Sequence, residues 1–208
     1  FPAWVVPNGE LADATYTVVA RAFDNASQYA AIYSTKVVTV DLTSPTVTVT
    51  YPAEGAVYSQ VQVATPMAGT TGDAGSFASQ ISSVTLVIYD DVDDVFFTGS
   101  GFGSGSPVWL GTNGGTFASW TYENANLTFT NDHLYRMRVK AVDAAGNTTY
   151  SSTRTFQYDA DIPTTTVTAP VPGYVTSLNT ISGTATDERQ GARAYEANAV
   201  LAAWREGL

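Results

Sequence analysis

The sequence of 208 residues contains no cysteine and a single histidine, His133. The chain therefore forms no disulfide, and a zinc site built from histidine and cysteine is excluded. A Ser-His-Asp triad would need His133, which stands in a polar turn before an expected strand, and no Gly-x-Ser-x-Gly elbow is recognisable. His133 is interpreted as a solvent-exposed turn residue, and the chain is expected not to be an enzyme.

Basic side chains are also few. Nine Lys and Arg residues stand against 19 Asp and Glu residues, which gives a formal net charge of −10. Nucleic acid is excluded as a partner because phosphate binding needs a basic face, and an anionic membrane surface is equally unsuitable. No apolar run is long enough to span a bilayer, so no membrane insertion is expected. The glycine stretch 99–105 lacks the spacing of a phosphate-binding loop and is interpreted as a plain loop.

What the sequence does contain is an internal repeat. Segments 16–27 and 135–147 each begin with Tyr, continue with small or apolar side chains at alternate positions, and reach an Asp eight residues later. Alternation with a period of two is typical of a half-buried strand. Asp143 followed by Gly146 suits a type I turn. Each segment is therefore expected to form a β-hairpin, with its turn at Asp24 or at Asp143.

The repeat extends well past these hairpins. The offset between copies is about 114 to 119 residues, the size of one β-sandwich domain. The further matches are Asp41–Pro45 with Asp159–Pro163, 46–55 with 165–173, Gly69–Asp73 with Gly183–Asp187, and Trp4 with Trp120. We expect three units: 1–41 as the C-terminal part of a truncated repeat, 42–161 as a complete one, and 162–208 as the N-terminal part of a further repeat with an atypical tail.

The complete unit is predicted to be an all-β domain. It is rich in Val, Thr and Tyr, poor in helix formers, and interrupted by glycine-rich turns. Antiparallel strands of this length predict a two-sheet sandwich. The strands are expected near 46–51, 58–65, 81–90, 94–98, 107–111, 117–122, 126–130, 134–142 and 149–158. In the tail 188–208, apolar residues fall at helical spacing and predict a short C-terminal helix.

The segments 45–49, 69–73, 81–90, 119–122 and 135–147 resemble the bacterial immunoglobulin-like repeats of large secreted and surface proteins. Those repeats are similar in shape to fibronectin type III and cadherin modules. The resemblance implies a non-enzymatic structural or adhesion module, a spacer from a tandem array, secreted or on the cell surface. It implies neighbouring immunoglobulin-like domains as partners. Tyr135 stands where a tyrosine corner would lie, with its hydroxyl bound to the backbone.

Two groups of carboxylates are candidate Ca²⁺ ligands. Asp90, Asp91, Asp93 and Asp94 crowd one short segment, which is either a solvated turn or a site bridged by a cation. They offer no fixed separation that would suit a glycosidase pair. At the unit boundaries, the turn Asp143–Asn147 is expected to converge with Asp159, Asp161 and Asp187, and Asp24, Asp41 and Asp73 to form the corresponding set at the other joint. Ordinary Asx turns are the alternative for Asp24 and Asp143.

Aromatic residues give the alternative function, a carbohydrate-binding accessory module of a secreted multidomain enzyme with surface glycans as partners. The candidate sugar-stacking rings are Phe102, Trp109 and Tyr122. The competing interpretation is core packing, since Trp120 alternates with Ser119 and Thr121 as a buried strand residue does. Two or three coplanar exposed rings would favour sugar binding.

The two partial units are complementary parts of one repeat. The linkers 41–45 and 159–163 are expected to leave the complete unit at opposite ends, at least roughly 20 Å apart. Each partial unit alone would leave an apolar face and unpaired strand edges exposed. Pairing between neighbouring chains, as a dimer or a head-to-tail chain, is therefore expected.

Overall fold

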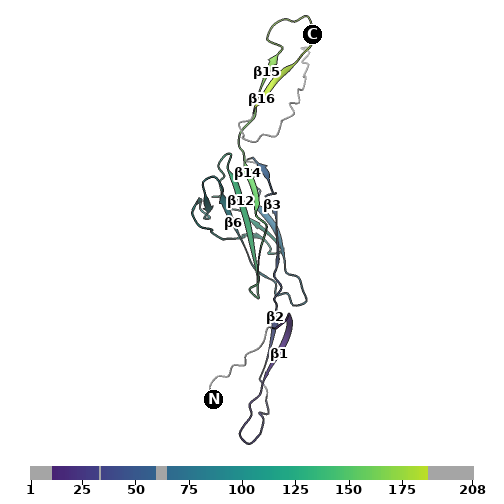
Figure 1. The fold of residues 1–208 in the computed structure, drawn as a ribbon, viewed down its shortest axis with the longest axis vertical. Coiled ribbons are helices and arrows are strands. Elements are labelled where there is room, and N and C mark those ends of the chain that lie inside the picture. The colour runs from purple at the N-terminus through teal and green to yellow at the C-terminus, as the bar shows by residue number, and fades with distance from the viewer. Residues whose placement is uncertain (1–10, 33, 60–64, 187–208) are drawn as a thin grey trace.

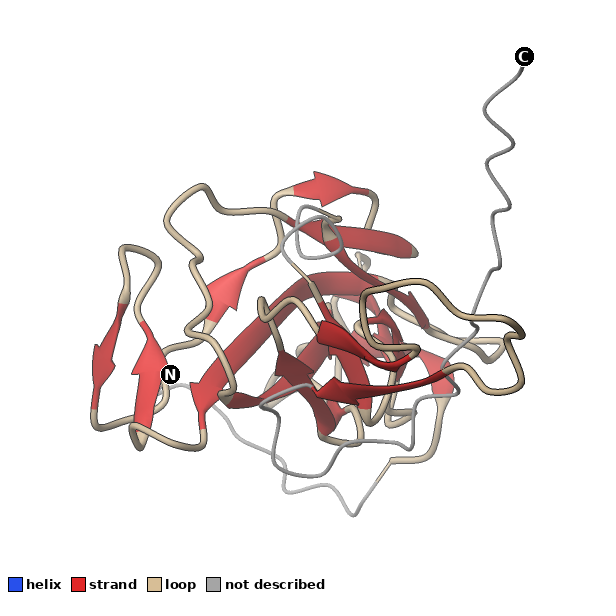
Figure 2. Cartoon of the chain, turned by 90° about the horizontal axis from the view of Figure 1, so that it is seen from above, coloured by secondary structure: helices blue, strands red, loops and turns tan. Residues whose placement is uncertain are grey.

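The protein is all-β. Its computed structural model describes residues 11–32, 34–59 and 65–186, which form strands and loops and no helix (Figure 2). No membrane-spanning helix occurs in this part of the chain. The tail helix predicted for 188–208, and also Trp4 and Asp187, lie outside the described residues.

The strands form three groups along the long axis of the molecule (Figure 1). A hairpin of β1 and β2 lies at one end, and a hairpin of β15 and β16 at the other. Neither hairpin pairs with a strand of the central group. The bounds of these four strands are Ala14–Ala20, Ser34–Val40, Thr164–Ala169 and Ser182–Thr186.

The central group consists of two sheets. In the smaller, four antiparallel strands follow the order β10-β11-β5-β3, with bounds Gly114–Gly115, Ser119–Tyr122, Met67–Gly72 and Thr46–Tyr51. The larger follows the order β4-β14-β12-β6-β7-β8, with bounds Ala56–Tyr58, Arg154–Tyr158, Leu134–Asp143, Ile81–Asp90, Val95–Phe97 and Phe102–Ser104. Two short strands, β13 (Thr148–Tyr150) and β9 (Leu110–Gly111), pair with β12 and β6. Within the larger sheet β4 and β14 are parallel, while the other pairs are antiparallel.

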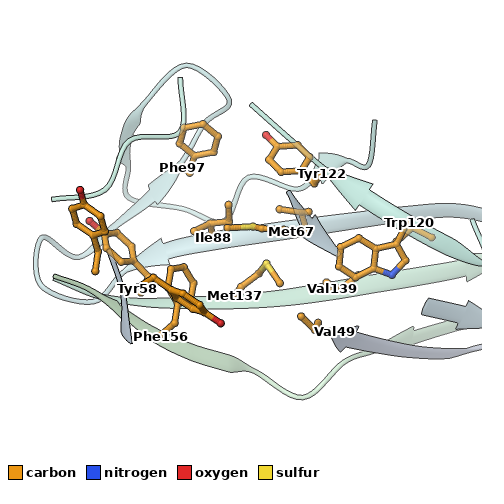
Figure 3. Packing of buried hydrophobic residues seen from close by; sticks show 14 residues of the cluster. Val49, Tyr58, Met67, Ile88, Phe97, Trp120, Tyr122, Met137, Val139 and Phe156 are labelled. Atoms are coloured by element: carbon orange, nitrogen blue, oxygen red, sulfur yellow. The ribbon is translucent and has the colours of Figure 1, made fainter. Parts of the chain in front are cut away.

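Both sheets contribute to one hydrophobic core (Figure 3). Alternate residues of β12 are buried, as the period of two in the sequence predicted. Trp120 of β11 is fully buried among them, which confirms its interpretation as a core residue. Gly69 of β5 makes room for this ring, since a Cβ there would lie 2.3 Å from an atom of the indole. The cluster includes Val49, Met67, Trp120 and Tyr122 of the smaller sheet and Leu86, Ile88, Tyr135, Met137, Val139 and Phe156 of the larger.

Tyr135 fastens the start of β12 to the preceding loop. Its hydroxyl accepts a hydrogen bond from the backbone N–H of Thr130 at 2.8 Å, as expected of a tyrosine corner. The ring is fully buried, and burial raises the pKa of Tyr135 to about 12. Segment 126–130, which was expected to be a strand, is instead a loop whose Leu127 and Phe129 pack against the core. The chain turns just before this loop at Asn124, whose side-chain oxygen accepts a hydrogen bond from the backbone N–H of Asn126.

Candidate functional site

Three carboxylates meet where the chain passes from the first hairpin into the central group of two sheets, which is called the central unit from here on. Oxygens of Asp41, Asp73 and Asp143 lie within 4.8 Å of one another. Asp41 follows β2, Asp73 follows β5, and Asp143 ends β12, so three separate strand ends bring these side chains together. Asp41 and Asp143 are both buried. Carboxylates this close repel one another unless donors or a cation compensate their charge.

Backbone donors supply part of that compensation. One oxygen of Asp143 accepts hydrogen bonds from the N–H groups of Gly146 and Asn147, at 2.7 and 2.8 Å, which is the predicted turn. Asp41 accepts from the N–H groups of Thr43 and Ser79, at 3.1 and 2.8 Å. The hydroxyl of Ser79, together with these two N–H groups, holds the pKa of Asp41 below its usual value despite burial. The carboxylate form of Asp41 is thus favoured.

Asp73 is compensated only in part. Its Oδ2 accepts a hydrogen bond from the N–H of Gln80 at 2.9 Å, whereas its Oδ1 is buried and has no hydrogen-bond partner. A buried acceptor without a donor costs free energy. Ca²⁺ takes carboxylate and carbonyl oxygens as ligands, so it is the kind of ion that this group of oxygens suits.

The side chain of Asn147 ties the linker to the cluster. Its Nδ2 donates to the backbone carbonyl oxygens of Asp41 and Thr43, at 3.0 and 3.2 Å, and to Asp143 Oδ2 at 2.9 Å. From the side of the first hairpin, Asp13 accepts hydrogen bonds from the N–H of Leu42 at 2.6 Å and the hydroxyl of Thr43 at 2.9 Å. The linker is therefore held by both of the units that it joins. Asp13 was not among the residues singled out from the sequence, and no local pattern distinguishes it.

This arrangement corrects the expected grouping at the joints. Asp143 and Asn147 lie with Asp41 and Asp73, not with Asp159 and Asp161, which group with Asp132. Since β12 runs for ten residues from Leu134 to Asp143, these two groups lie at opposite ends of a strand about 30 Å long. Asp24 is in neither group. It lies in the turn between β1 and β2, where its Oδ1 accepts from the N–H groups of Ala26 and Gln28 in an Asx turn.

The second joint is also hydrogen-bonded. Asn131 accepts from the N–H of Ala160 at 2.5 Å and donates to Asp161 Oδ2 at 2.9 Å. The N–H of Asp161 in turn donates to Asp159 Oδ1 at 3.0 Å. Asp159 and Asp161 thus shape the backbone where the chain leaves the central unit.

The four carboxylates of 90–94 have different partners. Asp91 pairs with Arg136 at 2.8 Å, and Asp94 accepts a hydrogen bond from the Tyr89 hydroxyl. Asp90 is buried, and only Asp90 and Asp93 of the four come together, with His133, within 4.8 Å. The segment is therefore mainly a turn in which Asp90, Asp91 and Asp94 each have a different partner, and not a site formed by all four.

His133 is the partner that the sequence did not reveal. Its Nδ1 lies 2.8 Å from Asp90 Oδ2, and the side chain is largely buried, so the expectation of an exposed turn histidine is corrected. Burial raises the pKa of Asp90, but the hydrogen bonds from His133 and from the N–H groups of Asp93 and Val92 outweigh it, and the pKa lies below the usual value. The two residues are 43 positions apart, so no local signal joins them.

The candidate sugar-stacking rings do not form one exposed row. Tyr122 is buried, with its hydroxyl accepting a hydrogen bond from Asn124 at 3.1 Å. Phe102 packs against the core, where its ring contacts Phe97 and Tyr135. Trp109 is half-buried beside the ring of Tyr150 and the ammonium of Lys140.

A cavity of about 350 Å³ opens at the end of the core near the second joint, lined by Tyr51, Pro52, Tyr58, Met67, Tyr122 and Phe129 among others. It carries no charged cluster, and its lining reaches Thr65, next to residues outside the described part of the chain.

Neither the known protein families nor the curated proteins include a match to this sequence.

Proposed function

We propose that the chain is a non-enzymatic spacer of a secreted or cell-surface bacterial protein, built from immunoglobulin-like β-sandwich units in tandem. Residues 42–161 form the complete unit, while 1–41 and 162–208 belong to its neighbours. The two sheets with a shared core, the tyrosine corner at Tyr135 and the repeated hairpins support this reading. A spacer works by holding its units in a defined direction, so its joints are the functional element.

The braced first joint is the observation that carries the proposal. Holding a flexible linker in one conformation costs about 1–2 kcal/mol of backbone conformational entropy per residue, so a linker such as 41–45 needs contacts that offset this cost. Here Asn147 on one side and Asp13 on the other hydrogen-bond its backbone, and Pro45 restricts it further. A joint held from both sides keeps the first hairpin in a fixed direction relative to the central unit.

The alternative, a carbohydrate-binding module, has less support. Two of its three candidate rings, Phe102 and Tyr122, pack in the core cluster. A catalytic function has less still, since the one histidine is bound to Asp90 at the end of a strand. A measured hydrolase activity that His133→Ala abolished would overturn the non-enzymatic assignment.

The rigidity of the joint can be measured directly. The chain has no cysteine, so spin labels attach only at introduced positions, such as the exposed Thr17→Cys in β1 and Glu123→Cys beyond β11. We expect a single narrow distance distribution by pulsed electron paramagnetic resonance. Adding Asn147→Ala should broaden it, while Asn179→Ala, an exposed site in the last hairpin's loop, should not. A broad distribution with the intact linker would contradict a fixed joint.

A further inference from the structure

The last hairpin has the structure of two strands from the central unit. β15 and β16 pair as β3 and β5 do, with a register shift after Val167 that matches the shift after Val49. A Cβ on Gly183 would lie 2.5 Å from the carbonyl oxygen of Thr166, just as one on Gly69 would lie 2.1 Å from that of Thr48. The β15–β16 hairpin is therefore the smaller-sheet half of a unit.

The first hairpin matches two strands of the larger sheet. In the central unit Tyr135 pairs with Phe156, and Met137 with Arg154. In β1–β2 the corresponding pairs are Tyr16 with Val38 and Val18 with Lys36, in the same register. The turns agree as well, since Asp24 and Asp143 each bind the N–H four residues ahead through Oδ1. The β1–β2 hairpin is therefore the larger-sheet half of a unit.

In the central unit these two halves cover each other. Val49 of β3 lies in one cluster with Met137 and Phe156, and Arg154 donates a hydrogen bond to the Val49 carbonyl at 2.8 Å. The corresponding residues of the hairpins have no such cover. Val167 is 69% exposed where Val49 is 4%, Val38 is 45% exposed where Phe156 is 1%, and Val18 is 50% exposed where Met137 is 1%. Each hairpin exposes the face that its counterpart buries.

The two hairpins of one chain lie at opposite ends of the central unit (Figure 1). Since β12 alone is about 30 Å long, they do not reach each other within one molecule. A second copy carries the complementary half in the required register. We propose that the β1–β2 hairpin of one copy packs on the β15–β16 hairpin of another and so assembles the halves of one unit across two chains. This proposal rests on the repeat within the chain and is independent of the spacer function.

The proposed contact has named partners. By correspondence with the central unit, Val18 and Val38 of one copy pack against Val167 of the other, and Lys36, which replaces Arg154, points its ammonium toward the carbonyl of Val167. Only a few apolar residues per side are involved, well below the roughly 800 Å² per partner of a standard interface. Self-association is therefore expected to be weak, with a dissociation constant of about 10 to 1000 µM.

Sedimentation equilibrium of the full chain tests the contact. The wild-type mass should rise with concentration toward about 1 mM, and Val38→Asp and Val167→Asp should each be monomeric. Val19→Asp and Thr166→Asp are matched controls on the opposite faces of β1 and β15, and should associate like the wild type. Val19 corresponds to the exposed Arg138. A monomeric wild type, or controls that lose association as the face variants do, would overturn the proposal.

Mixing the two face variants gives the sharpest result. Val38→Asp retains an intact β15–β16 face, and Val167→Asp retains an intact β1–β2 face. A one-to-one mixture should therefore form a heterodimer, although neither variant associates alone. This outcome does not require the altered hairpins to remain folded, because only the unaltered ones take part. Absence of the heterodimer at a concentration where the wild type associates would disprove the proposed pairing.

Discussion

The side-chain amide of Asn147 lies 3.0 Å from the backbone carbonyl oxygen of Asp41, a residue 106 positions earlier in the chain. With the bonds to Thr43 and Asp143, one side chain thereby connects the linker, the carboxylate cluster and the turn after β12. The stability of the central unit and the direction of the first hairpin are consequently linked through a single amide.

Replacing Asn147 by Ala should lower the free energy of unfolding by about 2 kcal/mol, because up to three hydrogen bonds are lost and two backbone carbonyls lose a donor. Urea denaturation of the full chain measures this, with Asn179→Ala as the exposed control. A change of less than about 0.5 kcal/mol, the range of ordinary surface substitutions, would mean that the amide does not hold the joint.

Gly69→Ala should strongly destabilise the central unit. The added methyl would lie 2.1 Å from the Thr48 carbonyl oxygen and 2.3 Å from the Trp120 ring, and neither can move freely. We expect a loss of about 3 kcal/mol, at the upper end of overpacking effects. Gly105→Ala, with no atom near the added Cβ, should change the free energy of unfolding by less than about 1 kcal/mol. Equal effects of the two substitutions would refute the close packing at β5.

Asp90 should contribute to acid sensitivity. Because its pKa is lowered in the folded state, its stabilising effect is fully present above the unfolded pKa of about 3.9 and is lost as the pH falls through the lower folded pKa. Asp90→Asn should be less stable than the wild type at pH 7 by about 1–3 kcal/mol, and should lose less stability on acidification below pH 4. Urea midpoints between pH 2.5 and pH 7 test this, and parallel curves for the two proteins would contradict it.

Tyr135 should have the opposite pH dependence. Its pKa is raised to about 12, so its contribution is fully present below the unfolded pKa of about 10 and is lost as the pH rises through about 12. Tyr135→Phe should cost about 1 kcal/mol at pH 7, since the Thr130 N–H loses its acceptor. Above pH 10 the gap to the wild type should narrow. A constant gap up to pH 12 would show that the buried hydroxyl does not titrate as expected.

Ca²⁺ should stabilise the folded chain if it binds the carboxylates of Asp41, Asp73 and Asp143. An ion that binds only the folded state at ten times its dissociation constant adds about 1.4 kcal/mol, and the melting temperature should rise accordingly. Asp73→Asn should remove the rise, whereas Asp91→Asn, in a different acidic segment, should retain it. An unchanged melting temperature of the wild type in millimolar Ca²⁺, compared with chelator, would show that Ca²⁺ does not bind the folded chain at this concentration.

The hairpins were predictable because their signals are local. A period of two along 135–142 and an Asp with Gly three positions later specify a strand and its turn. The first copy forms the same hairpin although Ser27 stands where the second has Gly146. The burial of Trp120 followed from its neighbours Ser119 and Thr121, and the hydrogen bond of the Tyr135 hydroxyl followed from the resemblance to immunoglobulin-like repeats. The strand expected at 126–130 did not form, because the apolar Leu127 and Phe129 cover the end of the core from a loop.

The candidate sites depended on long-range geometry. The antiparallel pairing of β12 with β14 sends Asp143 and Asp159 to opposite ends, so that a strand direction, and not a residue type, decides which acids meet. The contact of His133 with Asp90 depends on the pairing of β12 with β6, which no motif specifies. Composition could indicate that acids would cluster, but the partners of each acid needed the fold.

The parallel pairing of β4 with β14 has a consequence for a chain under tension. The chain enters the central unit through β3, just before β4, and leaves it at the end of β14. Pulling on the two ends would drag β4 and β14 past each other along their length, with Ala56, Val57 and Tyr58 held against Phe156, Gln157 and Tyr158. Hydrogen bonds that run across the strands are then loaded together, and do not open one after another as in a peeled hairpin. Forced unfolding depends on the unfolding rate, and hydrogen bonds that must break together make that rate low. Under tension the central unit should therefore unfold last, after the two terminal hairpins have opened.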